Sequence, residues 1–143
     1  MTSQAVTIYQ EIQKNTGMAM QAVNTLAERN QDNSLSLQIS RQSIKYAELY
    51  NEASRKLMNA KKEGYKANVV SDAMLRAGIR YHTLLNTSPE HIAELMIKGS
   101  NTGILEMEKA MKHNERAGQE ALGMAKQLIE FEQSNIKRLK DYL

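Results

Sequence analysis

The side chains of this sequence that are best suited to chemistry are a carboxylate and an imidazole on one helical stretch. Glu106 and His113 follow the segment KGSNTG, residues 98–103, and a carboxylate with an imidazole could begin a metal site. Their separation of seven residues equals two helical turns, so the two groups would lie ~10 Å apart along the helix axis. They cannot share one ion while both remain on that helix.

The acids and histidines also lack the pattern of a binuclear metal centre. Such centres in helical bundles take a Glu from each of two helices and a Glu-x-x-His pair from each of the other two. No histidine here has a glutamate three positions before it, where the residues are Ile79, Ser88 and Ala110. Only Glu132 lies within an apolar helical arc, while Glu11 and Glu106 lie at arc edges. We therefore expect no metal site and no resident cofactor.

Other catalytic arrangements are equally absent from the sequence. Cysteine does not occur, which excludes thiolate nucleophiles, disulfides and cysteine-ligated zinc. There is no GxGxxG or Walker-type loop, and the glycines of KGSNTG lack the preceding strand that a phosphate-binding loop requires. No serine has an identifiable histidine and acid to act as its base and orienting group. The sequence therefore favours a protein that is not an enzyme and has no catalytic residues.

Composition limits the class of protein further. The 143 residues suit one domain, residues 1–143, that is large enough to bury a core. The net charge of +3 is small and the basic residues are dispersed, so no nucleic-acid partner is expected. The first residues, MTSQAVTIYQ, do not form a secretory signal, and no apolar run reaches the ~18 residues of a membrane span. We expect a cytoplasmic protein with no membrane partner.

The elements that must position these residues are helices throughout. One proline and many Ala, Met, Leu, Gln, Glu and Lys residues favour helix, and breakers divide the chain into five segments. Ser88-Pro89-Glu90 is a strong helix start, and Gly64 after Lys61 and Lys62 is typical of a helix end. The expected helices cover residues 3–29, 34–63, 67–86 and 89–113, with a last helix ending near residue 142. Continuation of the fourth helix through residues 114–118 remains an open alternative.

Helix lengths and turns predict how these segments pack. Helices of 25 to 30 residues are ~40 Å long, and short turns make sequential helices antiparallel. The shorter third segment, whose apolar residues include Val70 and Leu84, would act as a crossover. The predicted fold class is all-α, an antiparallel four-helix bundle of ferritin-like arrangement with an extra crossover helix, five helices in total.

A resemblance supports the same fold. Residues 74–107, MLRAGIRYHTLLNTSPEHIAELMIKGSNTGILEM, and the ending LIEFEQSNIKRLKDYL resemble a family of small bacterial proteins of unknown function placed near the ferritin-like bundles. The resemblance covers about the second half of the chain, and HIAELMIKGSNTG is its most distinctive part. It implies a fold rather than an activity.

The two glycines of KGSNTG have a packing explanation. On a helical projection Ser100 and Gly103 point inward, and a mid-helix glycine costs ~1 kcal/mol, which close packing of a neighbour would offset. Polar residues are expected at the same level of the other helices, where buried hydroxyl and amide groups need partners. The predicted polar layer, which is either a hydrogen-bond network that fixes helix register or a small-molecule pocket, contains Asn15, Thr16, Tyr46, Tyr50, Ser100 and Gly103.

Association is the function that the sequence favours most. Leu105 and Gly17 fall on outward arcs, and nine methionines supply adaptable apolar surface. We expect a structural or protein-interaction role, with a homo-oligomer or a helical protein partner. The alternatives are a small-molecule-binding bundle with a polar mid-bundle pocket and an atypical ferritin-like metal-binding protein.

Overall fold

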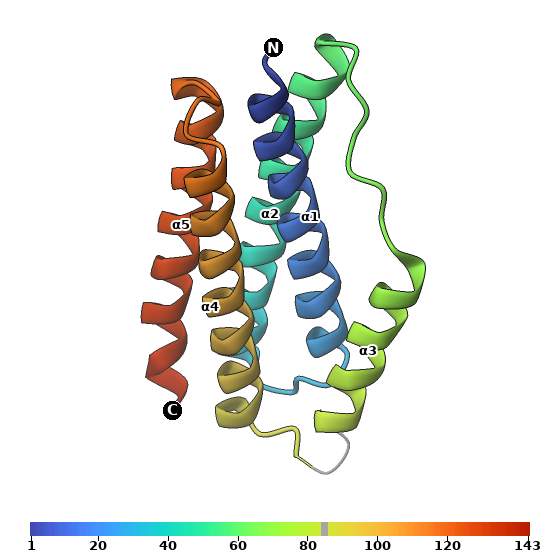
Figure 1. Ribbon diagram of the computed structural model, residues 1–143. Helices are drawn as coiled ribbons and strands as arrows, with labels where there is room; N and C mark the ends of the chain where they lie inside the picture. The colour runs from blue at the N-terminus through green and yellow to red at the C-terminus, as the bar shows by residue number, and fades with distance from the viewer. Residues whose placement is uncertain (84–85) are drawn as a thin grey trace.

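The computed structural model describes residues 1–83 and 86–143, without the side chains at positions 69 and 70, and this part of the chain is all helical (Figure 1). The expectation of an all-α chain is therefore confirmed. No helix in the described ranges is long and apolar enough to cross a membrane. The elements are α1 (Ser3–Ala27), α2 (Asn33–Asn59), α3 (Val69–Thr83), α4 (Pro89–His113), α5 (Gln119–Leu139) and a terminal 3-10 turn, η1 (Lys140–Tyr142).

Side-chain caps explain where three of the long helices begin. Thr2, Asp32 and Ser88 each accept a hydrogen bond from the backbone N–H three residues later, at 3.0, 2.8 and 3.2 Å respectively. These oxygens satisfy amides that have no partner within the helix. Pro89 occupies the first turn of α4, so the predicted start at Ser88-Pro89-Glu90 is confirmed.

The end of α2 differs from the expectation. The helix ends at Asn59 rather than at residue 63, and Lys61, not Gly64, has the left-handed backbone with φ 55°. The Lys62 N–H donates to the Leu57 carbonyl at 2.9 Å, which closes the helix end in a Schellman-type turn. Gly64 instead allows close approach, because a Cβ there would lie 3.1 Å from the Gln13 amide nitrogen.

The bounds of the third, fourth and last helices can also be compared with the expected ones. The third helix covers Val69–Thr83 and is shorter than the expected 67–86. Leu84 and the Val70 side chain, both expected on its apolar face, lie outside the described residues. The fourth helix ends at His113, since Asn114 leaves the helical conformation with φ -136° and ψ 44°, and Gly118 with φ 97° precedes α5. The last regular helix ends at Leu139, and residues 140–142 continue as the 3-10 turn.

The four long helices lie side by side and α3 lies outside them. The pair α1 and α2 and the pair α4 and α5 pack most closely, and α1 also packs against α3, α4 and α5. Figure 1 shows residues 60–68 and α3 running back along the molecule between the end of α2 and the start of α4. The core is aliphatic over most of its length, and its largest fully buried apolar side chains include Ile8, Ile12, Leu35, Leu49, Leu57, Ile92, Met107 and Leu139.

Candidate functional site

A buried carboxyl group interrupts the aliphatic core near the middle of the bundle. Glu132 of α5 is only 4% exposed, and its Oε1 accepts hydrogen bonds from three side chains. The Tyr46 hydroxyl of α2 donates at 2.5 Å and the Ser100 hydroxyl of α4 at 3.2 Å. Asn135, one turn along α5, donates its Nδ2 at 2.9 Å. We call these four residues the Glu132 cluster, and it joins three helices.

Burial controls the protonation of this cluster. Removal from water raises the pKa of Glu132, although the hydrogen bonds from Tyr46, Asn135 and Ser100 oppose the rise. The pKa of Tyr46 is also raised, first by burial and then by the negative charge of Glu132. Tyr46 therefore keeps its proton and acts as the donor to the carboxyl group. The rings of Phe131 and Tyr46 pack edge to face, with centroids 5.3 Å apart.

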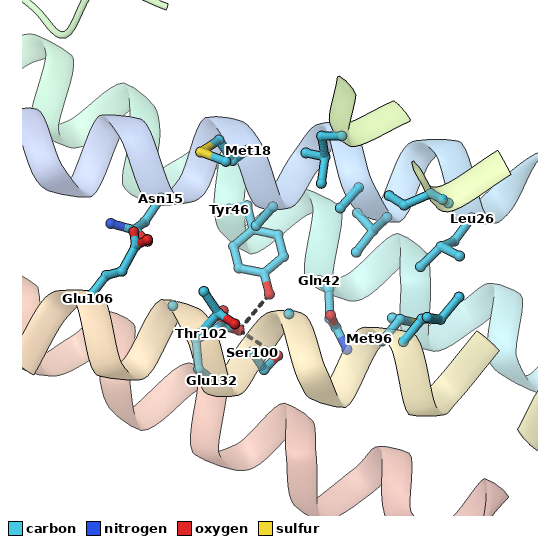
Figure 2. A pocket seen from close by; sticks show the side chains of 18 residues that line it. Asn15, Met18, Leu26, Gln42, Tyr46, Met96, Ser100, Thr102, Glu106 and Glu132 are labelled. Carbon is cyan, nitrogen blue, oxygen red and sulfur yellow. Dashed lines mark hydrogen bonds between the residues drawn. The ribbon is translucent and has the colours of Figure 1, made fainter. Parts of the chain in front are cut away.

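A pocket of about 260 Å³ lies beside the cluster, between α1, α2, α3 and α4 (Figure 2). Glu132, Tyr46 and Ser100 form part of its polar wall. Gly99 and Thr102 line it and are exposed, so the pocket opens toward solvent along α4. Its apolar wall comes from three helices and includes Met18, Val23, Leu26, Leu75, Ile79 and Leu95.

Gln42 places a buried amide in the wall of this pocket. It is 1% exposed, it lines the pocket, and its Nε2 has no hydrogen-bond partner in the described part of the chain. Figure 2 shows Gln42 pointing from α2 toward α4, on the same side of α2 as Tyr46. A buried amide that lacks a partner costs ~1–3 kcal/mol. Gln42 could therefore donate to a molecule that enters the pocket.

The structure brings together three of the six residues expected in the polar layer. Tyr46 and Ser100 meet at Glu132 Oε1, and Gly103 lies against the same carboxyl group. A Cβ at Gly103 would lie 3.2 Å from Glu132 Oε2, so the neighbour that the missing side chain admits is a carboxyl oxygen of α5.

The other three residues have different positions. Asn15 lines the pocket, but its Nδ2 donates to the Glu11 carbonyl at 2.9 Å and to Met107 Sδ at 3.5 Å. Thr16 is buried, yet its hydroxyl bonds to its own helix at the Ile12 carbonyl.

The expectation that Tyr50 belongs to the buried layer is wrong. Its side chain is 36% exposed, and its ring lies over Gly17 of α1, where an added Cβ would be 3.7 Å from Tyr50 Cε2. The buried face of α2 runs through Gln42, Tyr46 and Leu49, so a residue four positions after Tyr46 lies at the border of that face.

Sequence reasoning missed Gln42, Glu132 and Asn135 as members of the site. Glu132 was noted within an apolar arc, but it was weighed only as a metal ligand. All three occupy positions of the apolar repeat of their helices, Gln42 between Ile39 and Tyr46 and the other two between Leu128 and Leu139. Polar residues at such positions are the signal that could have identified the cluster.

The histidines take no part in this site. His91 Nε2 lies 2.8 Å from the carbonyl of His82, near the start of α4, and His113 is the last residue of α4. Within residues 1–83 and 86–143 no group of three or more His, Cys, Asp or Glu side chains is placed to hold a metal ion. Glu106 lines the pocket, and Glu132 is the other carboxylate there.

Comparisons of the chain with known protein families, with curated proteins and with solved structures found no match.

Proposed function

We propose that this protein binds a small, largely apolar molecule with one hydrogen-bonding end in the pocket beside the Glu132 cluster. The single observation that carries the proposal is the Gln42 Nε2 donor, which is buried in the pocket wall without a partner among the described residues. A polar layer that serves only helix register would use its donors within the protein, as the Glu132 cluster does. Gln42 departs from that pattern, and a ligand acceptor would satisfy it.

The size and lining of the pocket suit such a ligand. A cavity of ~150 Å³ holds benzene, so the 260 Å³ here accommodates a ligand of about ten non-hydrogen atoms. Apolar walls with a few convergent polar groups are typical of small-molecule sites. The cluster offers a hydrogen-bonding surface but no nucleophile with an activating base, which supports binding rather than catalysis.

The ferritin-like arrangement of the bundle is part of this proposal. It is supported by the reversed connection through residues 60–68 and α3, which lets α4 start again at the end where α2 starts (Figure 1). Binding of a metal by this bundle is less well supported, because the buried carboxyl group is surrounded by tyrosine, serine and asparagine side chains.

Binding can be tested with a variant that fills the pocket. Ala22 lines the pocket, whereas Ala27, on the same helix, is exposed and does not line it. We expect small aromatic fragments to shift the NMR methyl signals of Val23, Leu26 and Leu95 in the wild type and in Ala27→Leu, but not in Ala22→Leu. Shifts of equal size in both variants, or no shifts with any fragment, would contradict the proposal.

Self-association is a second candidate function, and one observation on α2 favours it. Leu37, Ile44 and Met58 are large, exposed apolar side chains spaced by seven and fourteen residues, with Asn51 completing the series. A repeat of seven places them on one outward stripe of α2, which corresponds to one of the two apolar positions of a coiled-coil heptad. A second copy of the same stripe would be self-complementary about a two-fold axis. We therefore propose that α2 pairs with α2 of another copy.

Light scattering coupled to gel filtration tests this association. Ile44→Lys should convert a dimer to a monomer, because a charge in the seam must be desolvated on pairing. Met74→Lys changes an exposed apolar residue of α3 and should leave the dimer intact. A wild-type protein that stays monomeric at high concentration would rule out the α2 seam.

A further inference from the structure

The charges that line the pocket are all of one sign. Glu106 and Glu132 line it, and none of the described lining residues is Lys, Arg or His. The whole chain carries a net charge of +3, so an acidic pocket without a cation departs from the rest of the protein. A buried carboxyl group in such a place lacks the counter-charge that normally offsets its loss of hydration.

The two oxygens of Glu132 differ in a way that indicates where a ligand would bind. Oε1 accepts three hydrogen bonds, whereas Oε2 has no hydrogen-bond partner among the described residues. Oε2 lies beside Gly103, where an added Cβ would be 3.2 Å from it and 4.0 Å from Asn15 Oδ1. The glycine therefore leaves a space bordered by two oxygen acceptors from α5 and α1.

The three donors on Oε1 also stabilise the charged form of the carboxyl group. The Tyr46 hydroxyl on α2 and the Ser100 hydroxyl on α4 donate to Glu132, and Glu106 on α4 and the neutral Asn15 on α1 line the same pocket. None of them supplies a positive charge. A cation from outside the protein would therefore meet a preformed acceptor that has no competing partner.

From this geometry we infer that the ligand is a small amphiphilic amine, with its ammonium group at Glu132 Oε2 and its apolar body against the wall formed by Met18, Val23 and Leu95. This inference rests on the proposed function and names the ligand class of the same pocket. An ammonium group has three donors, which suits the Glu132 and Asn15 oxygens together. A ligand that also carries an acceptor would engage the Gln42 amide at the other end of the polar wall.

A matched set of probes tests the charge preference directly. The probes are 4-phenylbutylamine, 4-phenylbutanol and 4-phenylbutyrate, which share one apolar body and differ in the end group. Titration calorimetry at neutral pH should show the amine binding about 10-fold or more tightly than the alcohol, since a hydrogen bond to a charged group is worth more than a neutral one. The carboxylate should bind least, because both acids repel it.

Variants of the two acids identify the source of the preference. Glu132→Gln keeps the size of the side chain and should bring the affinity for the amine down to that for the alcohol, with alcohol binding retained. Glu106→Gln, at the partly exposed edge, should reduce the amine affinity by a smaller factor. Glu130→Gln changes an exposed acid two residues earlier on α5, on another side of the helix, and should leave all three affinities unchanged. Circular dichroism spectra verify that each variant is folded.

A second measurement does not depend on any variant. The amine should bind more weakly as the pH falls and Glu132 takes up a proton, whereas the alcohol should change little. Equal affinity of amine and alcohol would overturn the charge preference and leave the proposed function standing. Tighter binding of the carboxylate would overturn it as well, and would mean that Glu132 donates a proton to the ligand. Failure of all three probes to bind would overturn both proposals.

Discussion

Gln42 and Tyr46 are one turn apart on the same face of α2, and both are almost completely buried, but their polar ends have opposite surroundings. The Tyr46 hydroxyl donates to Glu132 Oε1 and lies 3.5 Å from the Asn135 amide. The Gln42 Nε2 has no such partner in the described ranges and lies at the pocket. One turn of helix therefore separates a completed network from an incomplete one.

This difference between Tyr46 and Gln42 illustrates two roles of buried polar groups, one in stabilising the fold and one in binding a ligand. Groups that serve folding acquire their partners from the chain itself, because an unsatisfied one lowers the stability of the native state. A group left incomplete beside a cavity lowers stability without any gain in packing, and a ligand can supply the missing bond. The Glu132 carboxyl group belongs to both regions, since Oε1 is completed by the protein and Oε2 is not.

The largest effect on stability is expected when the Glu132 cluster loses its shared acceptor. Glu132→Ala leaves the Tyr46, Ser100 and Asn135 donors buried without their shared partner, and we expect a loss of about 3 kcal/mol in the free energy of unfolding. Urea denaturation measures it. Glu130→Ala, at an exposed position of the same helix, should change stability by less than ~0.5 kcal/mol. Similar losses in both variants would mean that the cluster does not stabilise the fold.

The pH dependence of stability should distinguish Glu132 from the exposed acids. The folded-state pKa of Glu132 is raised above its unfolded value by burial, so the folded protein holds the proton more tightly. Its contribution is complete below the unfolded pKa near 4.3 and is lost as the pH rises through the folded pKa.

We therefore expect the wild type to lose stability relative to Glu132→Gln as the pH rises from about 4, at no more than ~1.4 kcal/mol per pH unit for one proton. Subtracting the two urea-denaturation series cancels the exposed acids that both proteins share. A difference that is constant from pH 4 to pH 8 would contradict a buried, titrating Glu132.

Two glycines on α4, Gly99 and Gly103, should respond differently to substitution by alanine, with a smaller effect on stability. An alanine Cβ at Gly99 would have nothing within 4 Å, so Gly99→Ala should stabilise the protein by up to ~1 kcal/mol through helix propensity. Gly103→Ala would place its Cβ 3.2 Å from Glu132 Oε2, and the crowding should cancel that gain. Thermal denaturation of both variants measures the difference. An equal rise in melting temperature would mean that the space at Gly103 is not needed.

The smallest effect on stability is expected at Gln42. Gln42→Met keeps the volume of the side chain and removes an amide donor that has no partner among the described residues, so stability should stay the same or rise by ~0.5 kcal/mol. The affinity for a ligand that carries an acceptor should fall at the same time. A clear loss of stability would show that the Gln42 amide has a structural role, and the contrast with Tyr46 would no longer hold.

The sequence predicted those features of the fold that depend on neighbouring residues. The caps at Ser88 and Pro89 and the apolar repeat of each helix are local, and they located four of the five helix starts to within two residues. The end of α2 was misplaced because Lys61 adopts the left-handed conformation that usually falls to glycine. Local patterns favour a glycine at the end of a helix, but Gly64 instead lies close to the Gln13 side chain.

The composition of the site depended on contacts between distant residues. Tyr46 and Glu132 are 86 positions apart, and their pairing follows from how far α2 is shifted along α5, which no single-helix pattern specifies. Tyr46, Ser100 and Gly103 could be placed on inward faces from the period of each helix alone. Their shared partner, Glu132, could not be identified in this way. Tyr50 is exposed although it lies only about one turn from Tyr46, so a small change of angle around the α2 axis moves a residue out of the core.

The position of α3 has a kinetic consequence for the pocket. Leu75 and Ile79 of α3 form part of the pocket wall, yet α3 packs mainly on α1 and lies outside the four long helices. Local opening of such a peripheral helix requires less free energy than global unfolding. Amide hydrogens of α3 should therefore exchange with solvent well before those of α2 and α5, and opening of α3 would give a bound molecule a second exit besides the opening along α4.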